Sequence, residues 1–160
     1  MALDQFMKID SLKGESRDKE HKGEIEVLAW SWGLSNSGSA HSGSGAGAGK
    51  VNVQDLSFTK YVDKSTPDLL LAGCNGKHYK TALLTVRKAG EKPLEYLKIT
   101  LNEVLITSVS TGGSGGEDRL TENVTLNFAE VKVEYVEQTA TGGTGDKPSM
   151  TWNVATNSKD

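Results

Sequence analysis

The chain has 160 residues and a mass of 17.1 kDa, long enough to bury roughly 70% of its unfolded surface in one core. Eighteen Lys and Arg residues against 21 Asp and Glu residues give a formal charge of −3, whereas a duplex-binding surface normally needs a basic excess. The longest apolar run, residues 69–72, is far shorter than the roughly 20 residues that cross a bilayer. We therefore expect a single soluble domain over residues 1–160, with no nucleic-acid partner and no membrane insertion.

The amino terminus and the cysteine content restrict the route of export and the kinds of covalent and metal chemistry that the chain can use. Residues 1–10 carry acidic side chains before any basic cluster and lack an apolar stretch, so they do not read as a secretory signal. Cys74 is the single cysteine, which excludes an intramolecular disulfide and a thiolate-rich metal site. We expect no cofactor and a fold held together by packing alone.

Apolar residues alternate at period two along most of the chain, which is typical of half-buried β-strands. The pattern predicts strands at residues 5–9, 23–34, 51–62, 79–88, 94–109, 120–137 and 150–155. Within the 120–137 segment the apolar phase moves from Leu126 and Phe128 to Val131 and Val133, which predicts a β-bulge near residues 129–130. The fold class is therefore mainly β, a small β-barrel of seven to eight strands.

The strand at residues 23–34 has two unlike faces. Large apolar side chains occupy one face and small ones end the other: Leu28, Trp30, Trp32 and Leu34 on the first, Ala29, Ser31 and Gly33 on the second. We expect the first face to lie in the core and the second to face something open or closely approached. The three tryptophans, Trp30, Trp32 and Trp152, are predicted to anchor the core.

The residues near position 70 predict one short α-helix. Ser65 or Thr66 suits the N-cap, Pro67 suits the first turn, and Gly73 and Gly76 suggest where the helix ends. A helix of about ten residues is too short to stand alone, so it is expected to plug one end of the barrel or cover a sheet edge.

A glycine-rich loop is predicted at residues 37–50, and loops of this length are usually disordered or functional. Its end, GSGAGAGK at residues 43–50, invites comparison with a phosphate-binding loop. The first glycine of that motif is replaced by Ser44, and Val51 stands where a hydroxyl residue is required. An alternating strand follows instead of a helix, so nucleotide binding is not expected. The loop is either a surface linker or a segment that orders against another chain.

No set of residues typical of an enzyme is visible. His21, His41 and His78 lie in predicted loops without metal-ligand spacing, and we expect them to be solvated. The serines of the glycine-rich segments belong to hairpin-type loops and not to the strand-to-helix elbow of a hydrolase.

Carboxylates cluster after the glycine-rich residues 112–116, where Glu117, Asp118 and Glu122 lie near Arg119. Two carboxylates can act as acid and base in a hydrolase if burial separates their pKa values. Beside an arginine in a glycine-rich turn, these groups are predicted instead to form salt bridges or an intersubunit contact.

Three long segments carry a resemblance to a known family. They are IEVLAWSWGL at residues 25–34, LSFTKYVDKSTPD at 56–68 and STGGSGGEDRLTENVTLNF at 110–128. In this order they resemble the haemolysin-coregulated protein (Hcp) family, the tube subunit of the bacterial type VI secretion system. The resemblance runs from about residue 4 to residue 137.

The resemblance implies a β-barrel with one short helix that assembles with itself into a homo-hexameric ring, the rings stacking into a hollow tube. Its further partners would be the spike protein, the contractile sheath and small effector proteins, and its role would be structural, not enzymatic. The protein would be cytoplasmic before firing and then secreted without a signal peptide. Some members carry a C-terminal toxin domain, for which a chain that stops at Asp160 leaves no room.

The resemblance also indicates candidate site residues. Ser31 matches a position that lines the channel in the family, so Ala29, Ser31 and Gly33 are expected to face cargo or solvent in the lumen, the alternative being that they pack against a neighbouring strand. The loop at 37–50 resembles the family's extended loop, which reaches toward the next subunit or ring. Ring-stacking or intersubunit contacts are predicted for Ser39, His41, Ser42, Ser44, Glu117, Asp118 and Arg119.

Two other functions remain open on the residues alone. One is an autonomous monomeric β-barrel that binds a ligand or carbohydrate, although the small polar face of strand 23–34 suits an open channel better than an apolar cavity. The other is a secreted hydrolase, which lacks a visible nucleophile, metal or acid–base pair.

Overall fold

The structure is a computed structural model that describes residues 3–38, 50–90 and 93–159. Within these residues the chain forms one helix and nine strands, which confirms the mainly β prediction. In chain order they are β1 (Leu3–Ile9), β2 (Ile25–Ser31), β3 (Leu34–Ser35), β4 (Asn52–Val53), β5 (Leu56–Tyr61), α1 (Thr66–Asn75), β6 (His78–Lys88), β7 (Leu94–Gly112), β8 (Thr121–Tyr135) and β9 (Ser149–Asn153). Each predicted strand segment contains a strand, and the segments 23–34 and 51–62 each divide into two.

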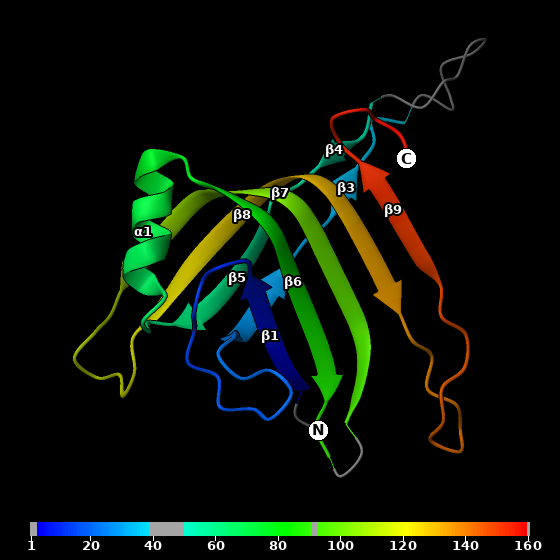
Figure 1. The fold of residues 1–160 in the computed structure, drawn as a ribbon, viewed down its shortest axis with the longest axis horizontal. Helices are drawn as coiled ribbons and strands as arrows, with labels where there is room; N and C mark the ends of the chain where they lie inside the picture. The colour runs from blue at the N-terminus through cyan, green and yellow to red at the C-terminus, as the bar shows by residue number, and fades with distance from the viewer. Residues whose placement is uncertain (1–2, 39–49, 91–92, 160) are drawn as a thin grey trace.

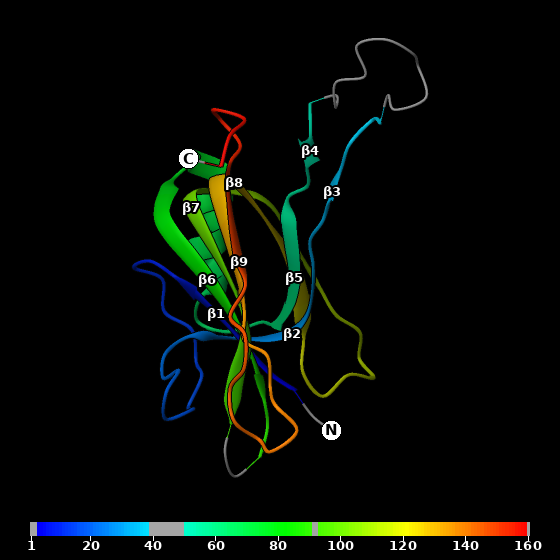
Figure 2. The ribbon, with the colours of Figure 1, turned by 90° about the vertical axis from the view of Figure 1, so that its right-hand side faces the viewer.

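Six strands close into an antiparallel barrel in the order β5-β2-β1-β6-β7-β8, and β8 pairs back onto β5 (Figure 1). The closure uses only the first half of β8, where residues 121–126 pair with β5. The second half, residues 130–134, pairs with β9, which therefore extends the sheet outside the barrel. β3 and β4 form a separate two-stranded ribbon that projects beyond the barrel (Figure 2).

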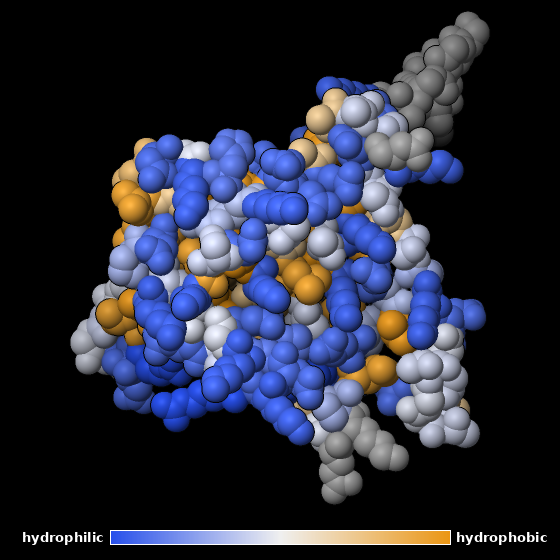
Figure 3. All heavy atoms as spheres, viewed as in Figure 1, coloured by the Kyte–Doolittle hydropathy of each residue, from blue (hydrophilic) through white to orange (hydrophobic). Residues whose placement is uncertain are grey.

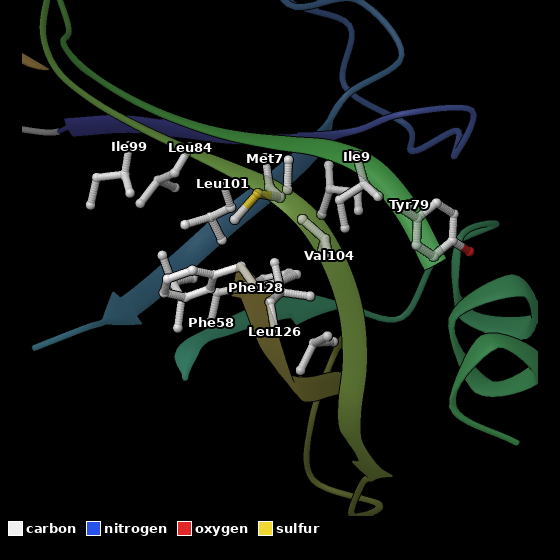
Figure 4. Close-up of a cluster of buried hydrophobic side chains, with 14 of the residues drawn as sticks. Met7, Ile9, Phe58, Tyr79, Leu84, Ile99, Leu101, Val104, Leu126 and Phe128 are labelled. Atoms are coloured by element: carbon white, nitrogen blue, oxygen red, sulfur yellow. The ribbon is translucent and has the colours of Figure 1, made fainter. Parts of the chain in front are cut away.

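The barrel is closed by rows of apolar side chains that run from strand to strand on its inner face (Figure 4). One row joins Met7, Leu84, Ile99 and Val133 through successive registers, and ends on Met150 of β9. Large side chains from the opposite wall, among them Phe58 and Leu126, fill the space between the walls. Each fully buried side chain of this size stabilises the fold by roughly 1.5–3 kcal/mol, so packing is the main source of stability.

The predicted change of phase on β8 occurs, but the predicted bulge does not. The buried side chains move from Phe128 to Val131, while the ladder with β7 keeps one register through residues 129–130. The reason is that β7 changes face at the same level, at Glu103, whose φ is 56°. The register shift between the two strands lies at residues 106–108 instead.

Helix α1 begins and ends where the sequence predicts. Ser65 precedes the first turn, although its side chain does not cap the helix, and its backbone N–H donates to Asp63 Oδ1 at 2.8 Å. Gly76 ends the helix with a φ of 71°, a left-handed conformation that glycine adopts without strain. Leu69 and Ala72 face the core, and α1 packs against β7 at one side of the barrel (Figure 1).

The connection at residues 10–24 covers the outer face of β1. It buries His21, so the prediction that His21 is solvated is wrong. His21 is buried, and its ring stacks on Phe6 with 4.4 Å between centroids. Its Nδ1 lies 2.9 Å from Glu24 Oε2 and its Nε2 lies 2.6 Å from Glu95 Oε1. Burial raises the pKa of Glu95, but the hydrogen bonds from His21 and Lys98 outweigh it and leave the pKa below its ordinary value.

The other two histidines differ from His21. His78 is exposed, as expected, but it opens β6 and does not lie in a loop. His41 lies outside the described residues. In the described part of the chain, no helix has the length and hydrophobicity needed to span a membrane.

Candidate functional site

The outer surface of β2, β5 and β8 is a polar sheet face that we call the polar face. Alternation along β5 and β8 sends apolar side chains into the barrel and small polar ones outward. The registers align the outward side chains in two rows: Ser31, Ser57, Thr125 and Ser108 in one, Ala29, Thr59, Asn123 and Ser110 in the other. The last residue of each row lies on β7, so the polar face spans four strands.

Hydrogen bonds across the strands hold the polar face in place. Thr59 Oγ1 donates to Asn123 Oδ1 at 2.6 Å, and the hydroxyls of Ser108 and Thr125 lie 2.7 Å apart. Just before β5 begins, Asp55 accepts hydrogen bonds from Thr107 at 2.8 Å and from Asn127 at 2.9 Å. Such cross-strand pairs each contribute about 0.2–1 kcal/mol, so these side chains are held in place and not free to collapse.

A shallow hollow of about 250 Å³ lies on this face. Its lining residues come from three strands: Ala29, Trp30, Ser31, Ser57, Phe58, Thr59 and Asn123. Its lining exposes more apolar than polar surface, and no described His or Cys is among the lining residues. The hollow therefore offers apolar as well as hydroxyl and amide groups to another surface.

The structure separates the three residues predicted to face the lumen. Ala29 and Ser31 lie together and exposed on the polar face. Gly33 lies beyond the end of β2, where its carbonyl accepts a hydrogen bond from the backbone N–H of Gln54 at 3.0 Å. A Cβ at Gly33 would stand 3.4 Å from Gln54 Oε1, an ordinary contact, so the space at this position does not require glycine.

Sequence reasoning missed most of the polar face. Thr59 and Asn123 complete the row that begins at Ala29, and Ser57 and Thr125 complete the row that begins at Ser31. Their only sequence signal is the polar half of the alternation in two strands. That signal indicates that one face of a strand is solvated. It does not indicate which strands lie next to one another.

The prediction that Leu28 and Leu34 lie in the core is wrong. Leu28 is exposed because the register of β2 with β5 shifts between Val27 and Ala29. Leu34 is exposed because it lies on the β3–β4 ribbon, which projects beyond the barrel. The shift changes which side chains of β2 face inward. Before the shift, Val27 points into the barrel and is buried. Trp30 and Trp32 pack partly against the core beyond it, as does Trp152, which confirms their role as core anchors.

The polar face ends in two unlike strand edges. On one side, β6 pairs with β7 only as far as Leu105, so no described strand pairs with residues 108–112 of β7 on the side away from β8. On the other side, β1 pairs with β2 only at Ile25 and Glu26, so no described strand pairs with Ala29 and Ser31 on the side away from β5. A free strand edge offers backbone groups to another chain.

The predicted carboxylate cluster does not stay together. Glu117, Asp118 and Arg119 are exposed in the turn between β7 and β8, and none of the three forms an ion pair with a described residue. Arg119 instead lies over the ring of Tyr61, 3.6 Å from its centroid. The salt bridges predicted within this turn are therefore wrong.

Glu122 points into the barrel and pairs with Lys60, and both side chains are fully buried. Lys60 Nζ also lies 3.1 Å from Asp63 Oδ1, and Thr66 Oγ1 donates to Glu122 Oε2 at 2.8 Å. This buried ion pair joins β5, β8 and the start of α1. It takes Glu122 away from the exposed turn that carries Glu117 and Asp118.

The remaining predicted contact residues, Ser39, His41, Ser42 and Ser44, lie outside the described residues. The described chain leads to them through the β3–β4 ribbon, in which Leu34 pairs with Val53 and Ser35 with Asn52.

These features define a small closed β-barrel with a four-stranded polar face, two free strand edges and a projecting ribbon. The profile of the family described as "Type VI secretion system effector, Hcp" matches residues 6–135. Protein hcp1 of Pseudomonas aeruginosa is 74% identical over 141 residues, which cover 88% of this chain and 87% of that protein. The chain belongs to the Hcp family of type VI secretion proteins.

Solved structures agree with this assignment. The crystal structure of Hcp1 from Salmonella typhimurium is 41% identical, with a TM-score of 0.83 over the full length of both chains. A type six secretion system protein, 32% identical, has a TM-score of 0.92 and covers 99% of this chain and 100% of its own. A type VI secretion system effector from Yersinia pestis is 37% identical, with a TM-score of 0.77 over 94% of this chain and 99% of its own.

Proposed function

We propose that this chain is a structural subunit of the type VI secretion inner tube, which forms hexameric rings that stack and carry effectors. The observation that carries the proposal is the polar face bounded by two unlike free edges, on β2 and on β7. If the β7 edge of one copy pairs with the β2 edge of the next, the contact is heterologous, and six copies close a ring when each is rotated by one sixth of a turn from the last. The four-stranded face then becomes a continuous inner wall.

In such a ring the rows that contain Ala29 and Ser31 line the lumen. Their small hydroxyl, amide and methyl groups leave the channel open and hydrated. A surface of this kind holds a folded effector through many weak polar contacts, which suits a cargo that must later be released. Gly33 contributes at the bend that leads from the wall to the β3–β4 ribbon.

Stacking of rings is assigned to the projecting ribbon and to the turn between β7 and β8. The ribbon leads to Ser39, His41, Ser42 and Ser44, and the turn carries Glu117, Asp118 and Arg119. Six copies at −3 each give a ring charge of −18, so like-charged rings repel and stacking should strengthen as salt is added.

Deletion of residues 39–47 tests the stacking assignment. The barrel is expected to stay folded, because every described strand of the barrel lies outside the deletion. Ring-on-ring association should weaken, as measured by electron microscopy of tubes. Tubes of normal length and number from the deletion variant would contradict the assignment.

The proposal places the protein in the cytoplasm until the apparatus fires, after which it leaves with the tube without a signal peptide. Its partners would be other copies of itself, the spike protein, the contractile sheath and small effector proteins. The role asks for no catalysis, which agrees with the use of Glu122 in a buried ion pair.

Native mass, measured by sedimentation with light scattering, tests the ring. The expected species has six times the 17.1 kDa mass of one chain. A strict monomer at high protein concentration would overturn the ring and favour an autonomous binding module.

A further inference from the structure

Two charged side chains lie where the fold otherwise buries apolar ones. Lys60 and Glu122 are 0% and 1% exposed, the lowest values for charged residues in the described part of the chain. Hydrophilic side chains gather instead at the surface, as Figure 3 shows for most of the face that carries β1 and β6. Taking two charges out of water costs free energy that their attraction only partly returns, so stability alone does not account for this pair.

The two residues are direct partners in the ladder between β5 and β8 that closes the barrel, which we call the closing ladder. Lys60 of β5 lies opposite Glu122 of β8, and Nζ of the lysine contacts Oε2 of the glutamate. Lys60 Nζ also lies 3.1 Å from Asp63 Oδ1, and Thr66 Oγ1 donates to Glu122 Oε2 at 2.8 Å. The pair therefore joins the closing ladder and the start of α1 at one point.

The alternation of apolar residues does not by itself fix the register of the closing ladder. A slip of one residue would turn one strand over and expose its apolar side chains. A slip of two residues keeps Phe58 of β5 and Leu126 of β8 facing inward, because side chains return to the same face at every second residue. The apolar pattern therefore permits registers that are shifted by two residues.

The neighbouring strands fix the position of β8 but not that of β5. β7 pairs with β8 from Thr121 to Tyr135, which is the whole length of β8. β2, the other neighbour of β5, pairs with it in two registers, one at Val27 and another from Ala29 onward. The register of β5 is therefore decided within the closing ladder.

The charged pair distinguishes among the possible registers. A slip of two residues in one direction would place Lys60 opposite Val124, and a slip in the other direction would place Glu122 opposite Phe58. Either slip leaves a buried charge facing an apolar side chain, which is strongly unfavourable. Among the registers that keep the apolar residues inside, only the observed one brings the two charges together.

We propose that the Lys60–Glu122 pair sets the register of β5 on β8 and thereby positions the polar face. In the observed register Ser57 lies opposite Thr125 within one row of that face, and a slip of two residues would break the row. The consequence for a lumen wall rests on the proposed function, whereas the register is a property of one chain. Lys60 and Glu122 are positioning residues, buried on the inner side of the strands whose outer side they align.

Disulfide trapping measures the register of the closing ladder. Each full-length variant carries Cys74→Ser, which removes the single native cysteine, and two new cysteines on the polar face. Ser57→Cys with Thr125→Cys reports the observed register, and Ser57→Cys with Asn127→Cys or with Asn123→Cys reports the two shifted registers. Directly opposite residues are close enough for a disulfide, whereas diagonal neighbours lie about 7–8 Å apart and are too distant. After oxidation in a glutathione buffer, peptide mass spectrometry of the monomeric gel band gives the fraction linked within one chain.

The outcome depends on the buried pair. With Lys60 and Glu122 in place, the cysteines of the observed register should oxidise and both shifted pairs should stay reduced. With Lys60→Met and Glu122→Leu, the linked fraction of at least one shifted pair should rise at least tenfold, while circular dichroism shows a folded chain. Shifted pairs that stay equally reduced in both backgrounds would overturn the proposal. A doubly substituted chain that does not fold would also overturn it, because the pair would then be needed for stability and not for register.

A matched control changes the neighbouring pair of the closing ladder without touching a charge. Phe58→Met with Val124→Ile alters two buried apolar side chains that lie directly opposite each other, and it should leave the shifted cysteine pairs reduced. An equal rise in this control would mean that apolar packing sets the register. Native mass separates this proposal from the ring, because a strictly monomeric unsubstituted chain would overturn the ring while the cysteine pairs still report the register.

Discussion

The inner and outer faces of the wall made by β5 and β8 are built from alternating residues of the same strands, yet they follow different rules. Inside, Phe58 and Leu126 are fully buried. Outside, Ser57 and Thr59 are small, polar and half-exposed. The inner face determines whether the chain folds, and the outer face is free to meet cargo or another chain.

The inner face also holds the one feature that packing alone does not explain. Lys60 and Glu122 are charged groups in the most buried layer of the barrel, and Glu122 Oε1 has no hydrogen-bond partner among the described residues. A buried ion pair contributes little over an apolar pair of similar volume, but it makes each partner dependent on the other. The stability of the wall is therefore most sensitive to substitution at the buried Lys60–Glu122 pair.

Loss of one member of this pair is expected to have the largest effect. Lys60→Met leaves the Glu122 carboxylate buried without its cation, which should lower the free energy of unfolding by about 3–5 kcal/mol. Urea denaturation followed by tryptophan fluorescence measures the change. The double variant Lys60→Met with Glu122→Leu should recover most of the loss, because no unpaired charge remains. An unchanged denaturation midpoint for Lys60→Met would contradict the claim that Glu122 depends on Lys60.

A cavity in the apolar part of the same face should cost somewhat less. Leu126→Ala removes a fully buried side chain that packs with Phe58, and the expected loss is about 3 kcal/mol. Denaturant midpoints measure it, with Leu120→Ala, an exposed leucine of the turn, as the matched control. Losses of equal size in the two variants would mean that the inner face does not carry the stability.

The local features of this fold could be predicted from the sequence. Helix α1 begins after Ser65 and ends before Gly76 because a proline in the first turn and a glycine with positive φ act over a few residues. The strands follow from alternation, which is equally local. Alternation also predicts that Ala29 and Ser31 point outward together, because both lie on one side of a single strand.

Features that depend on distant residues could not be predicted in this way. Leu28 reads as core by alternation, and only the register with β5 reveals the shift that exposes it. His21 is predicted to be solvated because its partner Glu95 is 74 positions away in the sequence. Glu122 reads as a member of an exposed cluster because Lys60, which draws it inward, lies on another strand.

A charge cluster outside the barrel should be weaker than the pair inside it, and its effect depends on pH. The hydrogen bond from Arg87 lowers the pKa of Asp18 from 3.8 to about 2. Because the folded pKa is the lower one, the stabilisation is fully present above pH 4 and is lost as the pH falls toward 2. The Asp18 side chain is 24% exposed, so solvent screening limits the contribution to about 1–2 kcal/mol.

Asp18→Asn tests this cluster by urea denaturation between pH 6 and pH 2. The variant should be less stable than the unsubstituted chain at pH 6, and the two curves should converge near pH 2. Asp4→Asn, which removes the more exposed partner of Arg87, should produce a smaller difference. Parallel curves for Asp18→Asn and the unsubstituted chain would show that Asp18 does not titrate in contact with Arg87.

The outer face should give the smallest change in stability and a change in function. Ser57→Asp places a carboxylate in the middle of the polar face, where it can stay hydrated, so the free energy of unfolding should change by less than about 0.5 kcal/mol. In a hexamer the substitution adds six negative charges to the lumen, which should lower the amount of acidic effector that co-purifies with the ring. Thr141→Asp, on an exposed turn after β8, adds the same charge outside the polar face and should leave co-purification unchanged. Equal losses of effector in the two variants would mean that the total charge of the ring governs retention, and not the face that Ala29, Ser31 and Ser57 share.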